Sequence, residues 1–281
     1  MTVKPTLGEE EMAAFEPEAK IGLLATRNPA GLPHVTLITS IQAKSPGELM
    51  WGQFCEGLSK EHVRADDRCG FLVMNAERNI WRGKARWTHA ASEGEDYVLF
   101  NQKPMFRYNA YFGIHTVHYM ELEELLPKER VFLPSVLAGT IVTAVARHFC
   151  RTTFTEPILK AWAEAHLRKV ETLKYLAFVA KDGYPEIVPV VPCQPADSRR
   201  LVFAPTGNRK ALAALSKGQS VALFALNLEM ESVLVRGTFA GYMRAFGLRA
   251  GMIDVDWVYN SMPPKQGPVY PPRPLHAVTA F

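Results

Sequence analysis

The sequence predicts a mainly β protein with helices, of the α+β class: two small antiparallel β-barrels, closed or split, joined by a helical segment. The first observation is an internal repeat, in which the same motifs recur in the same order. The paired motifs are GLPHVTLI at 31–38 and GYPEIVPV at 183–190, GLSK at 57–60 and GNRK at 207–210, and WRGKA at 81–85 and VRGTF at 235–239. The second observation is that short β-branched runs bounded by turn residues surround these motifs. The third is a length of 281 residues, which is typical of two domains.

The composition is that of an ordinary globular protein and excludes several classes of function. Hydrophobic residues make up 48% of the chain, and 32 basic against 28 acidic residues give a net charge of +4. Because the basic residues are dispersed, no nucleic-acid-binding tract is predicted. The four cysteines show no CxxC pair and no zinc-ligand spacing, so we expect free thiols in a reducing compartment.

Two segments decide whether a membrane is involved. The N-terminus is acidic and lacks the apolar stretch of a signal peptide. The least polar stretch, 131–144, is shorter than the ~18–20 residues that a membrane-spanning helix requires. We therefore expect it to be a helix buried on most sides between the domains, in a cytoplasmic protein with no membrane partner.

The first barrel, a split-barrel domain, is predicted over residues 1–125. The turn NPAG at 28–31 has the residue types of a tight turn, which makes its flanking strands a hairpin. The barrel is expected to have strands at 21–27, 33–41, 48–54, 69–74, 79–90 and 111–122, and helices at 58–67 and 92–109 with a break at Pro104.

A helical connector is predicted over residues 126–172. Thr155 is its expected N-cap, and a face of apolar residues at helical spacing should pack against a barrel. This face comprises Leu159, Trp162, His166, Val170 and Leu173. The second barrel follows over residues 173–281, without a counterpart of the helix at 92–109 and with a proline-rich tail.

Polar and basic residues recur where a short helix begins after the third strand of each barrel. The start of a helix offers free N–H groups and the positive end of the helix dipole, which together favour a phosphate. Ser59 and Lys60 stand there in the first barrel, and Asn208, Arg209 and Lys210 in the second. Because the pattern is repeated, we expect a phosphate group to be bound at this corner.

This ordered set of motifs resembles the pyridoxamine 5′-phosphate oxidase-like family of FMN-binding split barrels. The resemblance covers residues 21–122 and 175–260. It implies a split barrel in each half, FMN as cofactor and an oxidoreductase activity on an unidentified small molecule. It also implies a homodimer or an intramolecular pseudo-dimer of the two barrels, since the family binds FMN between barrels.

The resemblance also implies which residues contact the flavin. They come from the second strand of the hairpin, the end of the third strand, the two helix starts and the strand after the first helix. They are Thr36, Leu37, Ile38, Thr39, Trp51, Gln53, Ser59, Lys60, Asn79, Asn208, Arg209 and Lys210. Thr36 and Val188 stand where the oxidases have a basic residue, so pyridoxamine phosphate is not the expected substrate, and no catalytic residue is assigned.

Other readings of the sequence stay open. One or both barrels could be cofactor-free interaction modules, or could bind haem or a deazaflavin in place of FMN. A metal site is not predicted, because His115 and His118 lie three residues apart on a strand and point to opposite faces. His62, on the short helix, could approach a cofactor, but we expect it at the surface.

Overall fold

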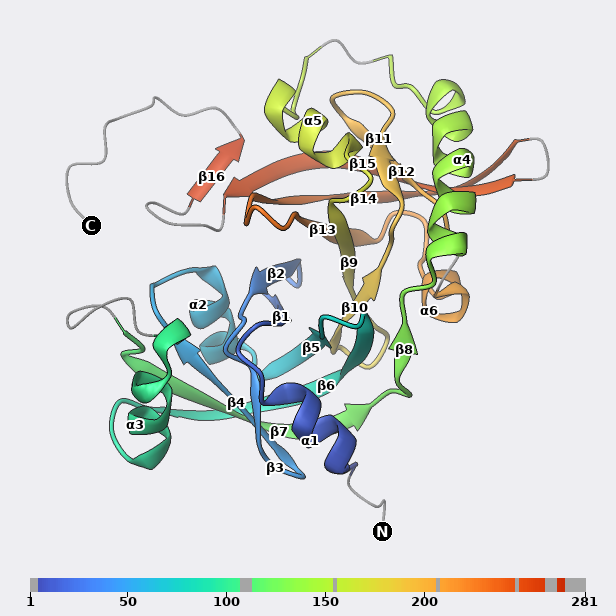
Figure 1. Ribbon diagram of the computed structural model, residues 1–281. Helices are drawn as coiled ribbons and strands as arrows, with labels where there is room; N and C mark the ends of the chain where they lie inside the picture. The colour runs from blue at the N-terminus through green and yellow to red at the C-terminus, as the bar shows by residue number, and fades with distance from the viewer. Residues whose placement is uncertain are drawn as a thin grey trace. The chain divides into compact units, whose positions relative to one another are not determined.

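The computed structural model describes residues 5–106, 113–153, 156–205, 208–245, 248–260 and 267–270. The chain divides into two compact units (Figure 1). Unit 1 comprises Met1–Val131 and Lys181–Glu186, and unit 2 comprises Phe132–Ala180 and Ile187–Phe281. Each unit is one antiparallel sheet with helices packed on it.

Unit 1 follows the predicted succession of strands and helices closely. Its elements are α1 (Glu9–Phe15), β1 (Ile21–Arg27), β2 (Pro33–Leu37), β3 (Gln42–Ser45), β4 (Glu48–Gln53), α2 (Leu58–Ala65), β5 (Arg68–Met74), β6 (Asn79–Ala91), α3 (Glu95–Gln102), a 3-10 turn (Pro104–Phe106), β7 (Thr116–Leu125) and β8 (Glu129–Arg130). The strand order is β2-β1-β5-β6-β7-β4-β3, with β8 paired to β6. The six predicted strands are confirmed, but β3 was not expected because QAKS lacks apolar alternation.

Unit 2 has the same strand order. Its elements are α4 (Leu133–Phe149), α5 (Ala161–Arg168), β9 (Leu173–Val179), β10 (Pro185–Pro189), β11 (Cys193–Pro195), β12 (Arg200–Phe203), α6 (Arg209–Ala213), β13 (Ser220–Leu226), β14 (Ser232–Ala245), β15 (Leu248–Asn260) and β16 (Gly267–Tyr270). The order is β10-β9-β13-β14-β15-β12-β11, with β16 paired to β15. As predicted, the described part of unit 2 has no counterpart of α3 between β14, which ends at Ala245, and β15, which begins at Leu248.

The two sheets repeat each other at a constant offset of 152 residues. Strand β1 (Ile21–Arg27) recurs as β9 (Leu173–Val179), and β5 (Arg68–Met74) as β13 (Ser220–Leu226). The register repeats too, because the pair Leu24↔Phe71 recurs as Leu176↔Leu223. The copies can therefore be compared residue by residue from β1 to β14.

The same offset reaches back to the first helix of each copy. Helix α1 begins at Glu9 and α5 at Ala161, 152 residues later, and both helices bury their last turn in their own unit. The segment before β9 is thus the start of the second copy, whereas the sequence suggested a connector. Its predicted apolar face is wrong in part, since Trp162 and Val170 are 49% and 46% exposed. Helix α5 ends at Arg168, and Thr155 lies outside the described residues.

Helix α4 has no counterpart among the described elements of unit 1. It buries only small or β-branched residues, against β11, β12 and β15: Val136, Gly139, Thr143 and Ala146. Leu137 and Ile141 are 64% and 65% exposed, so the expectation of a helix buried on most sides is wrong. Within the described part of the chain, no helix is long and apolar enough to span a membrane.

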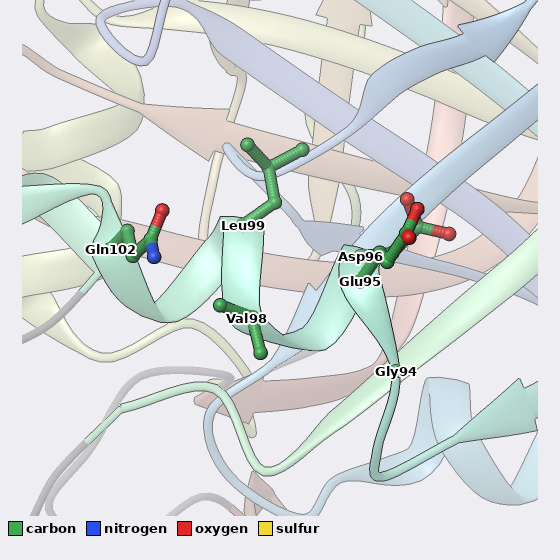
Figure 2. Close-up of a pocket in the computed structure, with 6 residues that line it drawn as sticks. All are labelled: Gly94, Glu95, Asp96, Val98, Leu99 and Gln102. Atoms are coloured by element: carbon green, nitrogen blue, oxygen red, sulfur yellow. The ribbon is translucent and has the colours of Figure 1, made fainter.

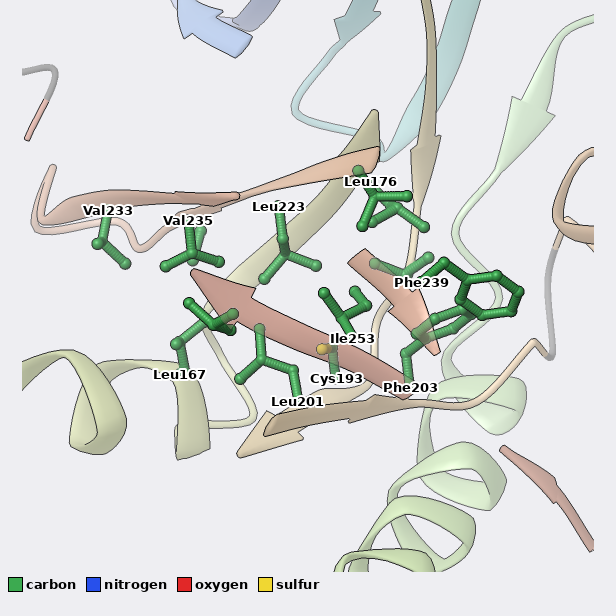
Figure 3. Packing of buried hydrophobic residues seen from close by; sticks show 14 of the residues in the cluster. Leu167, Leu176, Cys193, Leu201, Phe203, Leu223, Val233, Val235, Phe239 and Ile253 are labelled. Carbon is green, nitrogen blue, oxygen red and sulfur yellow. The ribbon is translucent and has the colours of Figure 1, made fainter. Parts of the chain in front are cut away.

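Each unit encloses a core of its own, built from the inward-facing residues of its strands. In unit 2, Leu167 of α5 joins Leu176, Leu223 and Phe203 in one cluster (Figure 3). In unit 1, Trp51, Phe71 and Trp81 occupy the interior, with Phe15 of α1 edge-on to the last two. These interiors hold most of the large side chains, so the polar groups they bury collect at the ends of the barrels.

One buried lysine in each unit lies at the end covered by α1 or α5. The ammonium group of Lys20 donates a hydrogen bond to the carbonyl of Pro17, and that of Lys174 to the carbonyl of Lys169. Pro17 and Lys169 are equivalent positions in the two copies, at the offset of 152 residues, whereas the two lysines are not. Burial lowers the pKa of each lysine to about 8.

Candidate functional site

Helix α2 brings the predicted residues Ser59 and Lys60 to one end of the unit 1 barrel. The helix packs on β1 and β2, and it starts after Gly57 with no side chain capping its first turn. Ser59 and Lys60 are 1% and 5% exposed, so both are turned into the protein. Burial lowers the pKa of Lys60, and the nearby Cys55 and Glu56 only partly offset this effect.

Strand β4 delivers two further predicted residues to the same end. Trp51 and Gln53 alternate into the barrel interior, and the imidazole of His118 on β7 lies flat on the Trp51 ring, with centroids 3.9 Å apart and an interplanar angle of 1°. Nε2 of His118 lies 2.7 Å from Oε1 of Gln53, and Nε1 of Trp87 donates to Nδ1 of His118 at 3.1 Å. The result is a buried polar chain across β6, β7 and β4.

His118 lies close enough to α2 for the charges of that helix to affect its pKa. Burial lowers its pKa to about 3, and the positive charges of Arg64 and Lys60 on α2 lower it further. The imidazole is therefore neutral over the physiological pH range. His62, also on α2, is buried, and its Nδ1 lies 3.1 Å from Oγ1 of Thr26. The expectation that His62 lies at the surface is wrong, because α2 turns this side towards β1.

Several polar atoms at this end of unit 1 have no hydrogen-bond partner within the described structure. They are Nε1 of Trp51, Nε2 of Gln53 and Oγ of Ser59, all buried. A buried donor without an acceptor costs about 1–3 kcal/mol. We call the group formed by Trp51, Gln53, Ser59 and Lys60 the α2-end cluster. It is rich in donors and lacks an acceptor.

The remaining predicted residues of unit 1 lie apart from this cluster to different degrees. Thr36, Leu37 and Thr39 are half-buried on or just after β2, and Ile38 is part of the core. Asn79 lies at the other end of β6, where its N–H donates to Oδ1 of Asn75. It precedes Trp87 by eight residues, roughly 26 Å of strand at ~3.3 Å per residue. The structure does not bring Asn79 and Ser59 together.

In unit 2 the predicted equivalence of the two helix starts is wrong. The strands on both sides of α2 and α6 keep the offset of 152 residues, so the counterpart of Lys60 is Leu212 rather than Lys210. Leu212 belongs to the unit 2 core, whereas Arg209 and Lys210 are exposed and Asn208 is half-buried. The motifs WRGKA and VRGTF are likewise out of register, since Gly83 pairs with Phe71 and Gly237 with Val221. In each case the alignment of the similar sequence motifs differs by two residues from the alignment of the strands.

The rest of the polar chain is also absent from unit 2. The counterparts of Trp51, Gln53 and Trp87 are Phe203, Pro205 and Phe239. The cross-strand partner of Phe203 is Gly251, where His118 stands opposite Trp51 in unit 1. A Cβ at Gly251 would lie 2.3 Å from Cζ of Phe203, so the ring fills the space of the missing side chain. The interior positions of the polar chain are thus apolar in unit 2, where the Tyr242 hydroxyl donates to the carbonyl of Leu212.

A pocket elsewhere in unit 1 has no connection with the predicted residues. It has a volume of about 650 Å³ and is open to solvent along the first turns of α3 (Figure 2). Among its lining residues, Asp96 accepts a hydrogen bond from the Tyr119 hydroxyl and pairs with Lys44 at 3.2 Å. Of its two acidic residues, Glu95 and Asp96, the second is thus already paired within unit 1.

Sequence reasoning missed Trp87 and His118 as members of the site. As expected, His115 is exposed while His118 is buried, on opposite faces of the chain. No group of three metal-ligating side chains is found in the described part of the chain. The useful signal was that His118 shares the inward face with Met120 and Leu122, an unusual place for an imidazole.

Comparisons with known proteins find similarity at the level of structure. No family model and no curated protein matches the sequence. HupZ of Group A Streptococcus is 12% identical over 42% of this chain and 91% of its own, with a TM-score of 0.36. An FMN-binding protein of Syntrophomonas wolfei is 11% identical over 40% and 78%, at 0.34, and a FAD-binding protein of Mesorhizobium loti 19% identical over 43% and 99%, at 0.27. Each of these structures matches less than half of this chain.

Proposed function

We propose that unit 1 binds a flavin, FMN, with the phosphate held by the α2-end cluster, and that the protein is an oxidoreductase acting on a small molecule that is still unidentified. The observation that carries this proposal is the set of buried donors without acceptors on Trp51, Gln53 and Ser59, together with the burial of Lys60 on the same helix as Ser59. The FMN-binding and FAD-binding proteins of similar fold agree with it.

The residues present fit a phosphate group. Phosphate oxygens accept hydrogen bonds and donate none at neutral pH, which matches an indole N–H, an amide NH₂, a hydroxyl and an ammonium group. Each charge-assisted bond contributes about 1.5–3 kcal/mol, so three or four would offset the cost of burying Lys60. When bound, FMN would supply the hydride or electron chemistry, and these side chains would hold it in position.

Unit 2 favours the alternative function, that of a cofactor-free module. The positions equivalent to Lys60, Trp51 and His118 are Leu212, Phe203 and Gly251, and the first two are part of the unit 2 core. Asn208, Arg209 and Lys210 stay a prediction as a second phosphate site, although α6 has only five residues. A homodimer or intramolecular pseudo-dimer and a cytoplasmic location also belong to the proposal, and light scattering tests the first.

The test is a titration of the purified protein with FMN, followed by flavin fluorescence. Lys60→Ala should weaken FMN binding by about 10–100-fold, the equivalent of one charge-assisted bond of 1.5–3 kcal/mol. Lys210→Ala is the matched control and should leave the affinity within about twofold, because an exposed ion pair contributes ~0–1 kcal/mol.

Four outcomes would contradict the proposal. Colourless protein that takes up no added FMN excludes flavin binding. A Soret band assigns haem instead, and mass analysis of extracted ligand distinguishes FMN from a deazaflavin. A larger loss of affinity in Lys210→Ala than in Lys60→Ala would place the phosphate in unit 2.

A further inference from the structure

A chain of three side chains, Trp87, His118 and Gln53, crosses the interior of unit 1 and ends in the α2-end cluster at Gln53. Nε1 of Trp87 donates to Nδ1 of His118 at 3.1 Å, and Nε2 of His118 lies 2.7 Å from Oε1 of Gln53. His118 and Gln53 are almost fully buried, and the two positive charges of α2 nearest to them are Lys60 and Arg64.

The first group of the chain determines the direction of every bond in it. An indole nitrogen can only donate, so Nδ1 of His118 must be the acceptor. A neutral imidazole then carries its hydrogen on Nε2. Nε2 therefore donates to Gln53, which must present its carbonyl oxygen to the histidine. The orientation of the Gln53 amide follows from this chemistry.

The other branch of the Gln53 amide is consequently turned away from His118. Its Nε2 is buried and has no acceptor within the described structure. Nε1 of Trp51, a donor only, lies two residues earlier on the same face of β4 and is in the same condition. The direction of the chain does not reverse with pH, because burial and the charges of Arg64 and Lys60 keep the pKa of His118 near 3.

We propose that Trp87 and His118 are positioning residues that fix the amide of Gln53 as a hydrogen-bond donor to the ligand of the α2-end cluster. The ligand must then present an acceptor oxygen at this point, as a phosphate, a carboxylate or a carbonyl does. A ligand group that can only donate a hydrogen bond would face the N–H of Gln53 with no acceptor between them, so such a ligand would bind weakly. This inference depends on the proposed function for its ligand, but the bond directions belong to the protein alone.

The bond directions are tested in the ligand-free protein by ¹⁵N NMR of the His118 ring at pH 7. We expect the Nε2–H tautomer in the wild-type protein. Trp87→Phe keeps an aromatic ring but removes the indole N–H, and should give a mixture of both tautomers. A wild-type ring in the Nδ1–H form, or an imidazolium, overturns the assignment, whatever the protein binds.

The role toward the ligand is tested by FMN titration of Gln53→Glu. The glutamate can still accept from Nε2–H of His118, but it offers no N–H, so FMN affinity should fall about tenfold or more. Trp87→Phe should reduce it about 2–10-fold, because the amide is no longer held in one orientation. Gln194→Glu is the control, since Gln194 is buried to a similar degree on β11 of unit 2 and should leave the affinity unchanged.

The outcomes separate this inference from the proposed function. If the wild-type protein binds FMN and both Gln53→Glu and Trp87→Phe bind it equally well, the positioning role is overturned while flavin binding stands. If the wild-type protein takes up no FMN, the proposed function fails and the role of Gln53 toward that ligand fails with it. The tautomer spectrum decides the bond directions in either case.

Discussion

Units 1 and 2 share one strand order and one register, but they differ in the side chains that they bury at the end covered by α2 or α6. In unit 1 the polar end is covered by α2 and contains Gln53, Ser59, Lys60 and His118. In unit 2 the equivalent positions are apolar. The frame of the barrel is thus maintained by the apolar middle of its strands, and its ends are free to diverge.

Unit 2 buries more polar side chains at the other end, beneath α5, where unit 1 buries Lys20. His166, Thr172, Lys174 and Ser232 are all buried there, and Nδ1 of His166 lies 3.7 Å from the carboxylate of Glu231. The counterparts in unit 1 include Ala14 and Ile80, which are apolar. A position that is polar in one copy is therefore no guide to the same position in the other. Each end has to be interpreted from its own contacts.

The largest expected effect comes from exchanging the residues at the one position that differs most in charge. Leu212→Lys should destabilise unit 2 by about 3–5 kcal/mol, because it buries an ammonium group among apolar side chains. Lys60→Leu should do the reverse in unit 1, raising the free energy of unfolding of the ligand-free protein by about 1–3 kcal/mol. Amide hydrogen exchange, analysed separately for each unit, measures both changes.

The proposed difference between the units is contradicted if Leu212→Lys and Lys60→Leu change the free energy of unfolding in the same direction. A destabilised Lys60→Leu protein would mean that the lysine is already well paired without a ligand. Leu215→Met, three residues further along the chain in the same core, is the control for packing and should cost less than about 1.5 kcal/mol.

The next effect is a pH dependence that the two units should share. Lys20 and Lys174 have pKa values lowered to about 8, so between pH 8 and 10.5 the unfolded chain keeps protons that the native state has lost. The contribution of each lysine to stability should therefore rise with pH over this range, by up to about 3 kcal/mol. Burial raises the pKa values of the thiols of Cys69 in unit 1 and Cys193 in unit 2, which acts in the opposite direction above pH 9. Lys20→Met should remove the contribution of Lys20 from unit 1 alone, and Lys174→Met that of Lys174 from unit 2 alone, as measured by hydrogen exchange of each variant and the wild-type protein at each pH. Loss of the rise in both units from a single substitution would show that the units do not respond separately.

The smallest expected effect tests which of the predicted residues of unit 1 contact the ligand. Asn79→Ala should leave FMN affinity within about twofold of wild type, because no bond to the ligand is lost. Ser59→Ala, which removes a buried hydroxyl without a partner, should weaken FMN binding by about 5–10-fold. An equal loss in both variants, measured in the same titration, would contradict the place assigned to Asn79.

Most of the fold could be predicted from the sequence, because turns and β-branched runs are local signals. The segments at 21–27 and 69–74 were assigned correctly for this reason. The candidate site could be predicted only in part. The similarity of the motifs GLSK and GNRK suggests that Lys60 and Lys210 are equivalent, whereas the register of the strands determines which residues are equivalent. His118 and Trp87 are 31 residues apart in sequence, and only the pairing of β6 with β7 brings them together.

The two buried lysines show how a duplicated protein can retain an interaction while moving its donor. The carbonyls of Pro17 and Lys169 are equivalent, yet they are reached from Lys20 in one copy and Lys174 in the other. The counterpart of Lys174 is Gly22, where a Cβ would lie 2.2 Å from the carbonyl oxygen of Ile38, so the first copy has no room for a side chain there. The donor has to come from a neighbouring position. An alignment scored by identity would count two unrelated substitutions, whereas an acceptor-by-acceptor comparison recovers a single preserved contact.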